Sequence, residues 1–324
     1  MGAQDGAKPG NQLLISLTVL LAAAFLLPGL APSFFGWTSG VLAIPVFCLL
    51  GLYGTKQGTI LVRNGAILAT VTAILLNQLP NVFFSLSLVP LAFSFSRSAT
   101  VKEDEILAGF KGFMVLGLSW VVFWSAYGIV HGVNPYSQLL QILDTGFAEA
   151  YALYIRNSEI PPETLIHLEQ AVKELRTIIP AILPGMLVCT LLFTVWINLL
   201  GGISLLKRLY PERIPWKKYR DWRLPDRLVW MPIAAGVALI IGKGVAGNAG
   251  LSFMLVSILL YFFQGLAVFI HFIDRWKVPL YLRIFIYGIL ILQSYGLLLL
   301  SVIGIADVWI DFRRRQNKDH QADN

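Results

Sequence analysis

Two carboxylates stand at the end of the last long apolar stretch of this chain, where a charge is costly. Asp307 and Asp311 are four residues apart, so they share one face if the segment is helical. Carboxylates at the edge of a membrane need a partner or water. Arg313, Arg314 and Arg315 follow within a turn. Two interpretations compete: a structural acidic pair held by these arginines, and a functional acidic site.

Four side-chain amides lie inside or at the ends of other apolar stretches. They belong to Asn77, Asn198, Gln264 and Gln293. Inside a membrane such groups mostly hold helices together through hydrogen bonds. They are also groups that could bind a substrate in a cavity between helices. We take these four residues as candidate substrate-binding positions.

The sequence lacks the motifs of common catalytic and metal sites. Residues 242–247 read G-x-G-x-x-G, but a dinucleotide site needs a preceding strand, and apolar stretches flank the motif here. A tight turn explains it, because glycine reaches conformations that are costly for other residues. Cys48 and Cys189 are isolated, and the four histidines are scattered. We expect no metal, no cofactor and no enzymatic activity.

The elements that must position these residues are long runs without charge. Residues 177–206, 244–273 and 284–306 contain no Asp, Glu, Lys or Arg. About 20 apolar residues in a helix cross the hydrocarbon core of a bilayer. Charged residues make up 13% of the chain, against about 25% in average soluble domains. The sequence therefore predicts an all-α, polytopic transmembrane bundle of about eight or nine spans.

The apolar runs suggest nine candidate spans, at 12–30, 37–54, 57–77, 80–97, 106–131, 178–206, 228–243, 248–273 and 280–306. Region 57–97 is either two full spans or a partly re-entrant hairpin. We divide the chain into an N-terminal bundle of about five spans (1–131), an external amphipathic helical segment (132–177), the sixth span (178–206), a basic cytoplasmic loop (207–227), the C-terminal spans (228–312) and a polar tail (313–324).

Charge in two connections predicts the orientation. Segment 132–177 has six acidic residues against three basic ones, whereas 207–227 has eight basic residues against three acidic ones. Excess Lys and Arg place a short loop in the cytoplasm, so the N-terminus is inside and 132–177 outside. Three spans after the basic loop would put residues 313–315 outside, against the same rule. The side of the C-terminus stays open.

The external segment contains a helical pattern that follows Pro161 and Pro162. Its apolar residues recur at steps of three and four and form one face. Such a helix lies on the bilayer surface, packs on the bundle or pairs with a coiled-coil partner. The members of this face are Leu165, Leu168, Val172, Leu175 and Ile179.

Short motifs in the C-terminal third resemble a known family. They read Trp-Arg-Leu-Pro at 222–225, Gln-Gly at 264–265, Gly-Ile-Ala-Asp at 304–307 and Asp-Phe-Arg at 311–313. Together with the hydropathy layout they resemble the uncharacterised YybS-like family of bacterial membrane proteins, a domain of unknown function. That family is distantly similar to the S components of energy-coupling-factor transporters, which implies about six helices with both ends cytoplasmic.

The chain departs from the S-component pattern in three ways. Its first helix lacks the A-x-x-x-A patch that docks such components on a coupling subunit, and the nearest match is Ala69 and Ala73 in the third span. The extra C-terminal spans and the insert at 132–177 are the other two departures. They leave docking to a vitamin-transporter module in doubt.

The sequence supports three hypotheses for an integral protein of the bacterial inner (cytoplasmic) membrane. The first is transport-related binding of a small molecule within the helix bundle. The second is a non-enzymatic membrane scaffold or biogenesis factor with a membrane protein partner. The third, a lipid-modifying enzyme, rests only on Asp307 and Asp311. The expected lipid partners are anionic headgroups at 207–227, which is rich in Lys, Arg, Trp and Tyr. Nucleic acid is not expected as a partner, because the cluster of basic and aromatic residues does not extend beyond this one loop.

Overall fold

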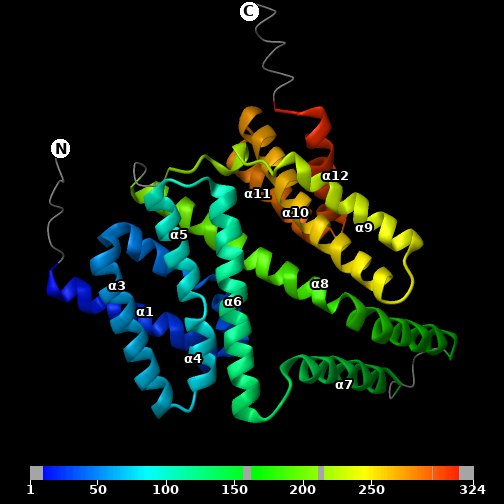
Figure 1. The fold of residues 1–324 in the computed structure, drawn as a ribbon, viewed down its shortest axis with the longest axis horizontal. Coiled ribbons are helices and arrows are strands. Elements are labelled where there is room, and N and C mark those ends of the chain that lie inside the picture. The colour runs from blue at the N-terminus through cyan, green and yellow to red at the C-terminus, as the bar shows by residue number, and fades with distance from the viewer. Residues whose placement is uncertain (1–9, 156–161, 211–214, 294, 314–324) are drawn as a thin grey trace, which may run out of the picture. The chain divides into compact units, whose positions relative to one another are not determined.

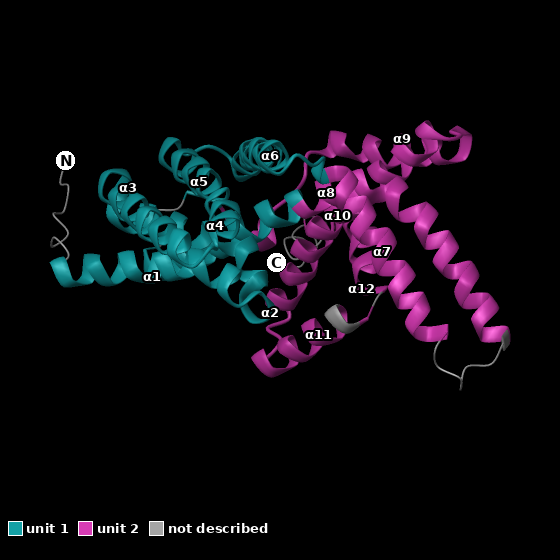
Figure 2. Cartoon of the chain, turned by 90° about the horizontal axis from the view of Figure 1, so that it is seen from below, with its two compact units in different colours: residues 1–135, 191–216 teal, residues 136–190, 217–324 magenta. Residues whose placement is uncertain are grey.

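The computed structural model describes residues 10–155, 162–210, 215–293 and 295–313, and every regular element in these ranges is helical (Figure 1). Six helices are long and apolar enough to cross a membrane, or up to seven if one bent pair is counted as a single span. The predicted all-α polytopic class is confirmed, while the sequence suggested eight or nine spans. The chain divides into two compact units, residues 1–135 with 191–216 and residues 136–190 with 217–324 (Figure 2).

Unit 1 contains the N-terminal helices of the chain. They are α1 (Asn11–Leu30), α2 (Pro32–Phe35), the 3-10 helix η1 (Gly36–Val41), α3 (Ala43–Leu75), α4 (Leu79–Leu86), α5 (Val89–Val101) and α6 (Glu105–His131). The C-terminal part of α8 (Pro162–Leu209) also belongs to this unit. Phe47 and Phe95 meet edge to face with ring centroids 5.8 Å apart in its core. Gly202 and Gly112 lie against these rings, so the helices approach closely there.

A sharp corner divides α3 where the sequence predicts a boundary between two spans. Gly54 has φ 74° and ψ 169°, which a residue with a Cβ rarely adopts. The helix on one side of this corner starts only at Ala43, after η1, and is too short to cross a bilayer by itself. Within region 57–97, Leu79–Val101 is long and apolar enough to be a span.

Unit 2 contains α7 (Pro135–Ile155) except its first residue, the N-terminal part of α8, and the C-terminal helices. These are η3 (Tyr219–Asp221), η4 (Asp226–Val229), α9 (Trp230–Ile241), α10 (Val245–Arg275), α11 (Leu280–Leu292) and α12 (Tyr295–Ile310). The predicted span 228–243 becomes α9, which has 12 residues and is short for a full crossing. The predicted span 280–306 becomes α11 and α12, bent by 103°. The short α9 and the bend between α11 and α12 account for part of the lower span count.

Glycines set the packing of α10 on α12. A Cβ at Gly265 would lie 1.8 Å from the carbonyl oxygen of Leu300, and one at Gly304 would lie 2.0 Å from that of Tyr261. Ser301 Oγ donates to the carbonyl oxygen of Ile258 at 2.8 Å. Small residues at a membrane helix interface permit this close backbone approach. The contacts of residues 258, 261 and 264 with residues 301, 304 and 307 follow the same order along both helices, so α10 and α12 run parallel.

Candidate functional site

The four predicted amides do not form one site. Asn77 lies exposed in the turn after α3, with φ 54°. Gln293 is exposed at the end of α11. Asn198 is buried in unit 1 and Gln264 is buried in unit 2. Within each unit, one of the two predicted amides is buried and the other is exposed.

Asn198 uses its amide to hold the start of α3. Its Oδ1 accepts from the backbone N–H of Ile44 at 3.1 Å, and its Nδ2 donates to the carbonyl oxygens of Gly40 at 2.7 Å and Thr194 at 2.8 Å. These bonds satisfy backbone groups where η1 gives way to α3. The amide of Asn198 therefore has a structural use, since its hydrogen bonds join α8 to the start of α3.

Gln264 belongs to a buried polar network around Asp307. Asp307 is fully buried, and its Oδ2 accepts from Arg313 Nη2 at 2.6 Å and from Gln264 Nε2 at 3.0 Å. The Oε1 of Gln264 accepts from the backbone N–H of Leu224 at 3.2 Å. One amide thus connects the middle of α10, the end of α12 and the basic loop. Leu224 lies in the Trp-Arg-Leu-Pro motif.

The two aspartates have different partners. Asp311 pairs with Arg223 of the basic loop, with 3.2 Å between Oδ2 and Nη1. Arg313 Nη1 also donates to the carbonyl oxygens of Arg220 at 3.2 Å and Trp222 at 2.8 Å. Arg314 and Arg315 lie outside the described residues. Arg223 is thus a partner that sequence reasoning missed, because 88 residues separate it from Asp311.

A second ionic cluster centres on Asp274 near the end of α10. Arg283 of α11 lies 2.6 Å from Asp274 Oδ1, and Arg220 lies 3.3 Å from Oδ2. Arg220 therefore links the two clusters, since its carbonyl oxygen accepts from Arg313. The start of α11 and the end of α12 both reach the basic loop. Within unit 2, the chain therefore enters α11 and exits α12 at the same end of the unit, the end that holds the basic loop.

The ionic network is close to charge balance. The aspartates 221, 226, 274, 307 and 311 face the arginines 220, 223, 283 and 313. In the described ranges, Asp307 Oδ1 and Arg223 Nε are buried without a hydrogen-bond partner. The same ranges hold no group of three or more His, Cys, Asp or Glu side chains that could bind a metal. Paired guanidinium groups leave little negative potential for a cation, and this geometry favours the structural interpretation of the aspartates.

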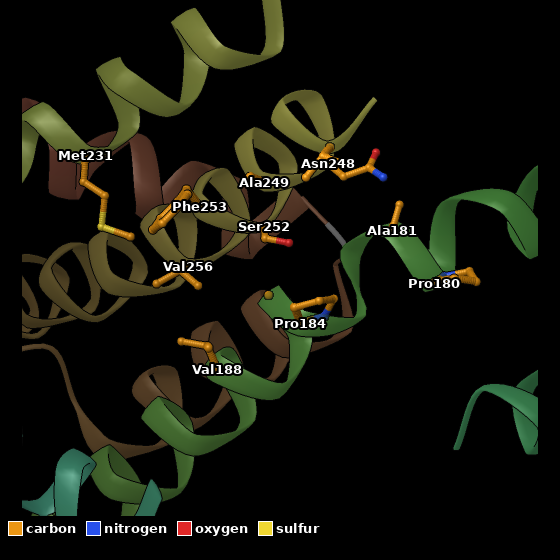
Figure 3. A pocket seen from close by; sticks show the side chains of 12 residues that line it. Pro180, Ala181, Pro184, Val188, Met231, Asn248, Ala249, Ser252, Phe253 and Val256 are labelled. Carbon is orange, nitrogen blue, oxygen red and sulfur yellow. The ribbon is translucent and has the colours of Figure 1, made fainter. Parts of the chain in front are cut away.

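An apolar groove of about 550 Å³ lies elsewhere in unit 2 (Figure 3). We call it the α8–α10 groove. Its lining comes from residues 180–188 of α8, Met231 of α9 and residues 245–256 of α10. Pro180 and Pro184 lie inside α8, and each removes a backbone donor from the helix. Asn248 and Ser252 are directed from α10 towards α8 in Figure 3.

Comparison with known proteins identifies the family. The family described as predicted membrane protein (DUF2232) matches residues 15–308. The chain belongs to this family. No curated protein and no solved structure matches it. The expected membership of a membrane-protein family of unknown function is thereby confirmed, and the distant similarity to S components is not shown.

This DUF2232 chain is a membrane protein in which the motifs of the C-terminal third converge. Trp-Arg-Leu-Pro, Gln-Gly and Gly-Ile-Ala-Asp supply Leu224, Gln264 and Asp307 to one network. The sequence signalled each motif separately, and only the fold shows that they meet. For the α8–α10 groove, the prolines at 180 and 184 are a signal that sequence reasoning could have used, whereas Asn248 and Ser252 look like ordinary helix residues.

Proposed function

We propose that this membrane protein is a non-enzymatic, transport-related protein that binds a small, mainly apolar molecule in the α8–α10 groove. The groove itself supports the proposal. Ligand pockets commonly have volumes of about 300–1,000 Å³, apolar walls and a few convergent polar groups. The groove has about 550 Å³, and Asn248 and Ser252 are the polar side chains in its lining. Of the other predicted positions, Asn198, Gln264, Asp307 and Asp311 make hydrogen bonds or ion pairs within the fold, and Asn77 and Gln293 are exposed.

The proposed location is the cytoplasmic (inner) membrane, with the basic loop inside the cell. The excess of Lys and Arg in 207–227 supports this side. Arg208, Lys217, Lys218 and Arg227 are exposed, whereas Arg220 and Arg223 form ion pairs with aspartates. The exposed members would contact anionic lipid headgroups, each contributing about 1 kcal/mol near such a surface.

Thermal unfolding of purified protein tests small-molecule binding. The protein in mild detergent is heated with a panel of apolar and amphiphilic metabolites, and binding raises the transition temperature. We expect at least one compound to stabilise the wild type and Ala234→Trp, which changes an exposed position on α9 outside the groove. Ala249→Trp, which fills the groove, should abolish the shift. A panel that stabilises all three proteins equally would refute the groove as the site.

A scaffold or biogenesis function is favoured by one observation. Outside the candidate spans, α7 carries exposed apolar side chains, among them Ile142, Leu153 and Tyr154. Such side chains suit a membrane protein partner or the bilayer surface. Photo-crosslinking from position 153 in intact membranes distinguishes these cases: a reproducible protein adduct supports the scaffold, and lipid adducts alone do not.

A further inference from the structure

The α8–α10 groove opens towards the hydrocarbon of the bilayer. Phe253, which lies more than two turns inside α10, is 57% exposed, although α10 qualifies as a membrane span. An apolar side chain exposed within a membrane span faces lipid chains rather than water. A molecule enters the groove sideways from the membrane, so a lipid is better placed to reach it than a water-soluble metabolite.

The length of the groove suits one leaflet. Its lining on α10 runs from Val245 to Val256. At 1.5 Å per residue this distance is about 17 Å. Half of a hydrocarbon core of about 30 Å is about 15 Å. An extended hydrocarbon chain from one leaflet therefore fits along α10.

The floor of the groove is shaped by close packing of α8 on α10. A Cβ at Gly185 would lie 2.7 Å from the Cα of Ser252, so the two helices nearly touch at this point. Pro180, one turn earlier on α8, leaves the carbonyl oxygen of residue 176 without its usual helical donor, and Pro184 does the same for residue 180. The groove thus has mainly apolar walls, with Asn248 and Ser252 as the polar side chains of its lining.

A positive charge stands in the chain just before the end of the groove that Val245 lines, and we call this end the mouth. Lys243 is exposed two residues before Val245, and no ion pair is formed by it among the described residues. The same point is the N-terminus of α10, where free N–H groups favour an anion. The other end of α10 carries Asp274 and meets the basic loop. The positive mouth therefore lies at the membrane face opposite that loop.

We propose that the α8–α10 groove binds an anionic phospholipid of this leaflet. One acyl chain lies along α10 between Val245 and Val256. The phosphate group lies at Lys243 and the start of α10, within reach of the Asn248 amide. This inference rests on the proposed function and names its ligand class, a membrane lipid with a negative headgroup.

Native mass spectrometry of the full chain tests the inference. The protein is reconstituted in vesicles of equal parts phosphatidylglycerol and phosphatidylcholine, extracted in mild detergent and analysed for retained lipid. We expect retained phosphatidylglycerol on the wild type and on Ala234→Trp, and its loss from Ala249→Trp. Lys243→Gln should keep a lipid but lower the preference for phosphatidylglycerol about fivefold, since one interfacial charge is removed.

Several results would overturn the inference. They are no lipid on the wild type, equal retention by Ala249→Trp, or equal retention of both lipids by the wild type. If Ala249→Trp unfolds, Ala181→Phe fills the groove from α8 and takes its place. Retained lipid together with no stabilising metabolite would support the lipid site against a metabolite-transport function. Stabilisation by a metabolite without any retained lipid would support the small-molecule function and refute the lipid site.

Discussion

At the scale of single residues, the full burial of Asp307 decides how its carboxylate is used. A buried charge needs a partner of opposite charge and further hydrogen bonds. Arg313 and Gln264 supply these to Oδ2, and the backbone N–H of Leu224 in turn fixes Gln264. The arrangement therefore ties the chain after α12 to α10 and the basic loop. Removing one member of the pair should cost more than removing both.

We predict that Arg313→Gln destabilises the protein by about 3–5 kcal/mol, the usual cost of stranding a buried charge. Adding Asp307→Asn should restore part of this loss, because the uncompensated carboxylate is gone. Thermal unfolding in detergent and the amount of folded protein in the membrane measure both effects. Arg227→Gln, at an exposed position of the basic loop, should change little. A double variant less stable than Arg313→Gln would contradict the pairing.

Glu103 offers a second test at the residue scale, in the connection between α5 and α6. Its Oε1 lies 2.5 Å from Lys111 Nζ and its Oε2 accepts from Ser98 at 2.8 Å. The hydrogen bond from Lys111, followed by that from Ser98, lowers the pKa of Glu103 below its ordinary 4.5. A lowered folded-state pKa gives stability that is present above pH 4.5 and is lost as the pH falls through the folded value.

We therefore predict that Glu103→Gln lowers the transition temperature at neutral pH and that this difference shrinks below about pH 4.5. Unfolding of the detergent-purified protein across a pH series measures it. The exposed Glu149→Gln serves as the control and should show no such pH-dependent gap. If the loss in transition temperature of Glu103→Gln stays the same at acidic pH, the ionised carboxylate is not what stabilises the connection between α5 and α6.

At the scale of elements, the α10–α12 contact depends on the absence of two side chains. Gly265 and Gly304 face each other's backbones, and a methyl group at either would overlap a carbonyl oxygen. The helices must separate to admit it, and this would also stretch the Gln264–Asp307 bond of 3.0 Å. Backbone packing and the ionic network therefore stabilise the same contact.

Gly265→Ala and Gly304→Ala should each destabilise the protein by several kcal/mol, at the upper end of the range of about 1–3 kcal/mol for overpacking or beyond it. Gly288→Ala is the matched control, since a Cβ there meets nothing within 4 Å and α11 gains a better helix former. The measurement is the thermal transition temperature of each of the three variants, compared with that of the wild type. Equal effects at all three positions would show that the close approach is not limiting.

Hydropathy predicted which segments are apolar helices, but not where they break. An uncharged run reads the same whether the helix is straight or bent, so 280–306 looked like one span, although it contains the 103° bend. The corner at Gly54 coincides with the predicted boundary between 37–54 and 57–77, although Ala43–Leu75 counts as one candidate span and not as two. The pairing of Asp307 with a neighbouring arginine was also visible locally. The pairing of Asp311 with Arg223 was not, because the loop holds eight basic residues and only tertiary contacts choose among them.

At the scale of the whole molecule, the bend between α11 and α12 changes the topology. As one span, 280–306 would carry residues 313–315 to the side opposite the basic loop, against the distribution of Lys and Arg. The contacts of Arg313 with Arg220 and Trp222 place the end of α12 beside that loop instead. The positive charges of the loop and of Arg313 then lie on one side, which removes the conflict for Arg313.

This topology predicts the labelling of single cysteines in intact cells. In a background with Cys48→Ala and Cys189→Ala, a membrane-impermeant thiol reagent should label Lys243→Cys. It should leave Lys218→Cys and a cysteine tag at the C-terminus unlabelled until the cells are opened. Lys243 precedes α10, whose other end meets the loop, so it reports the opposite face. Labelling of the C-terminal tag together with position 243 would mean that α11 and α12 cross the membrane as one span. Labelling of position 218 but not 243 would reverse the orientation while leaving the return of the chain intact.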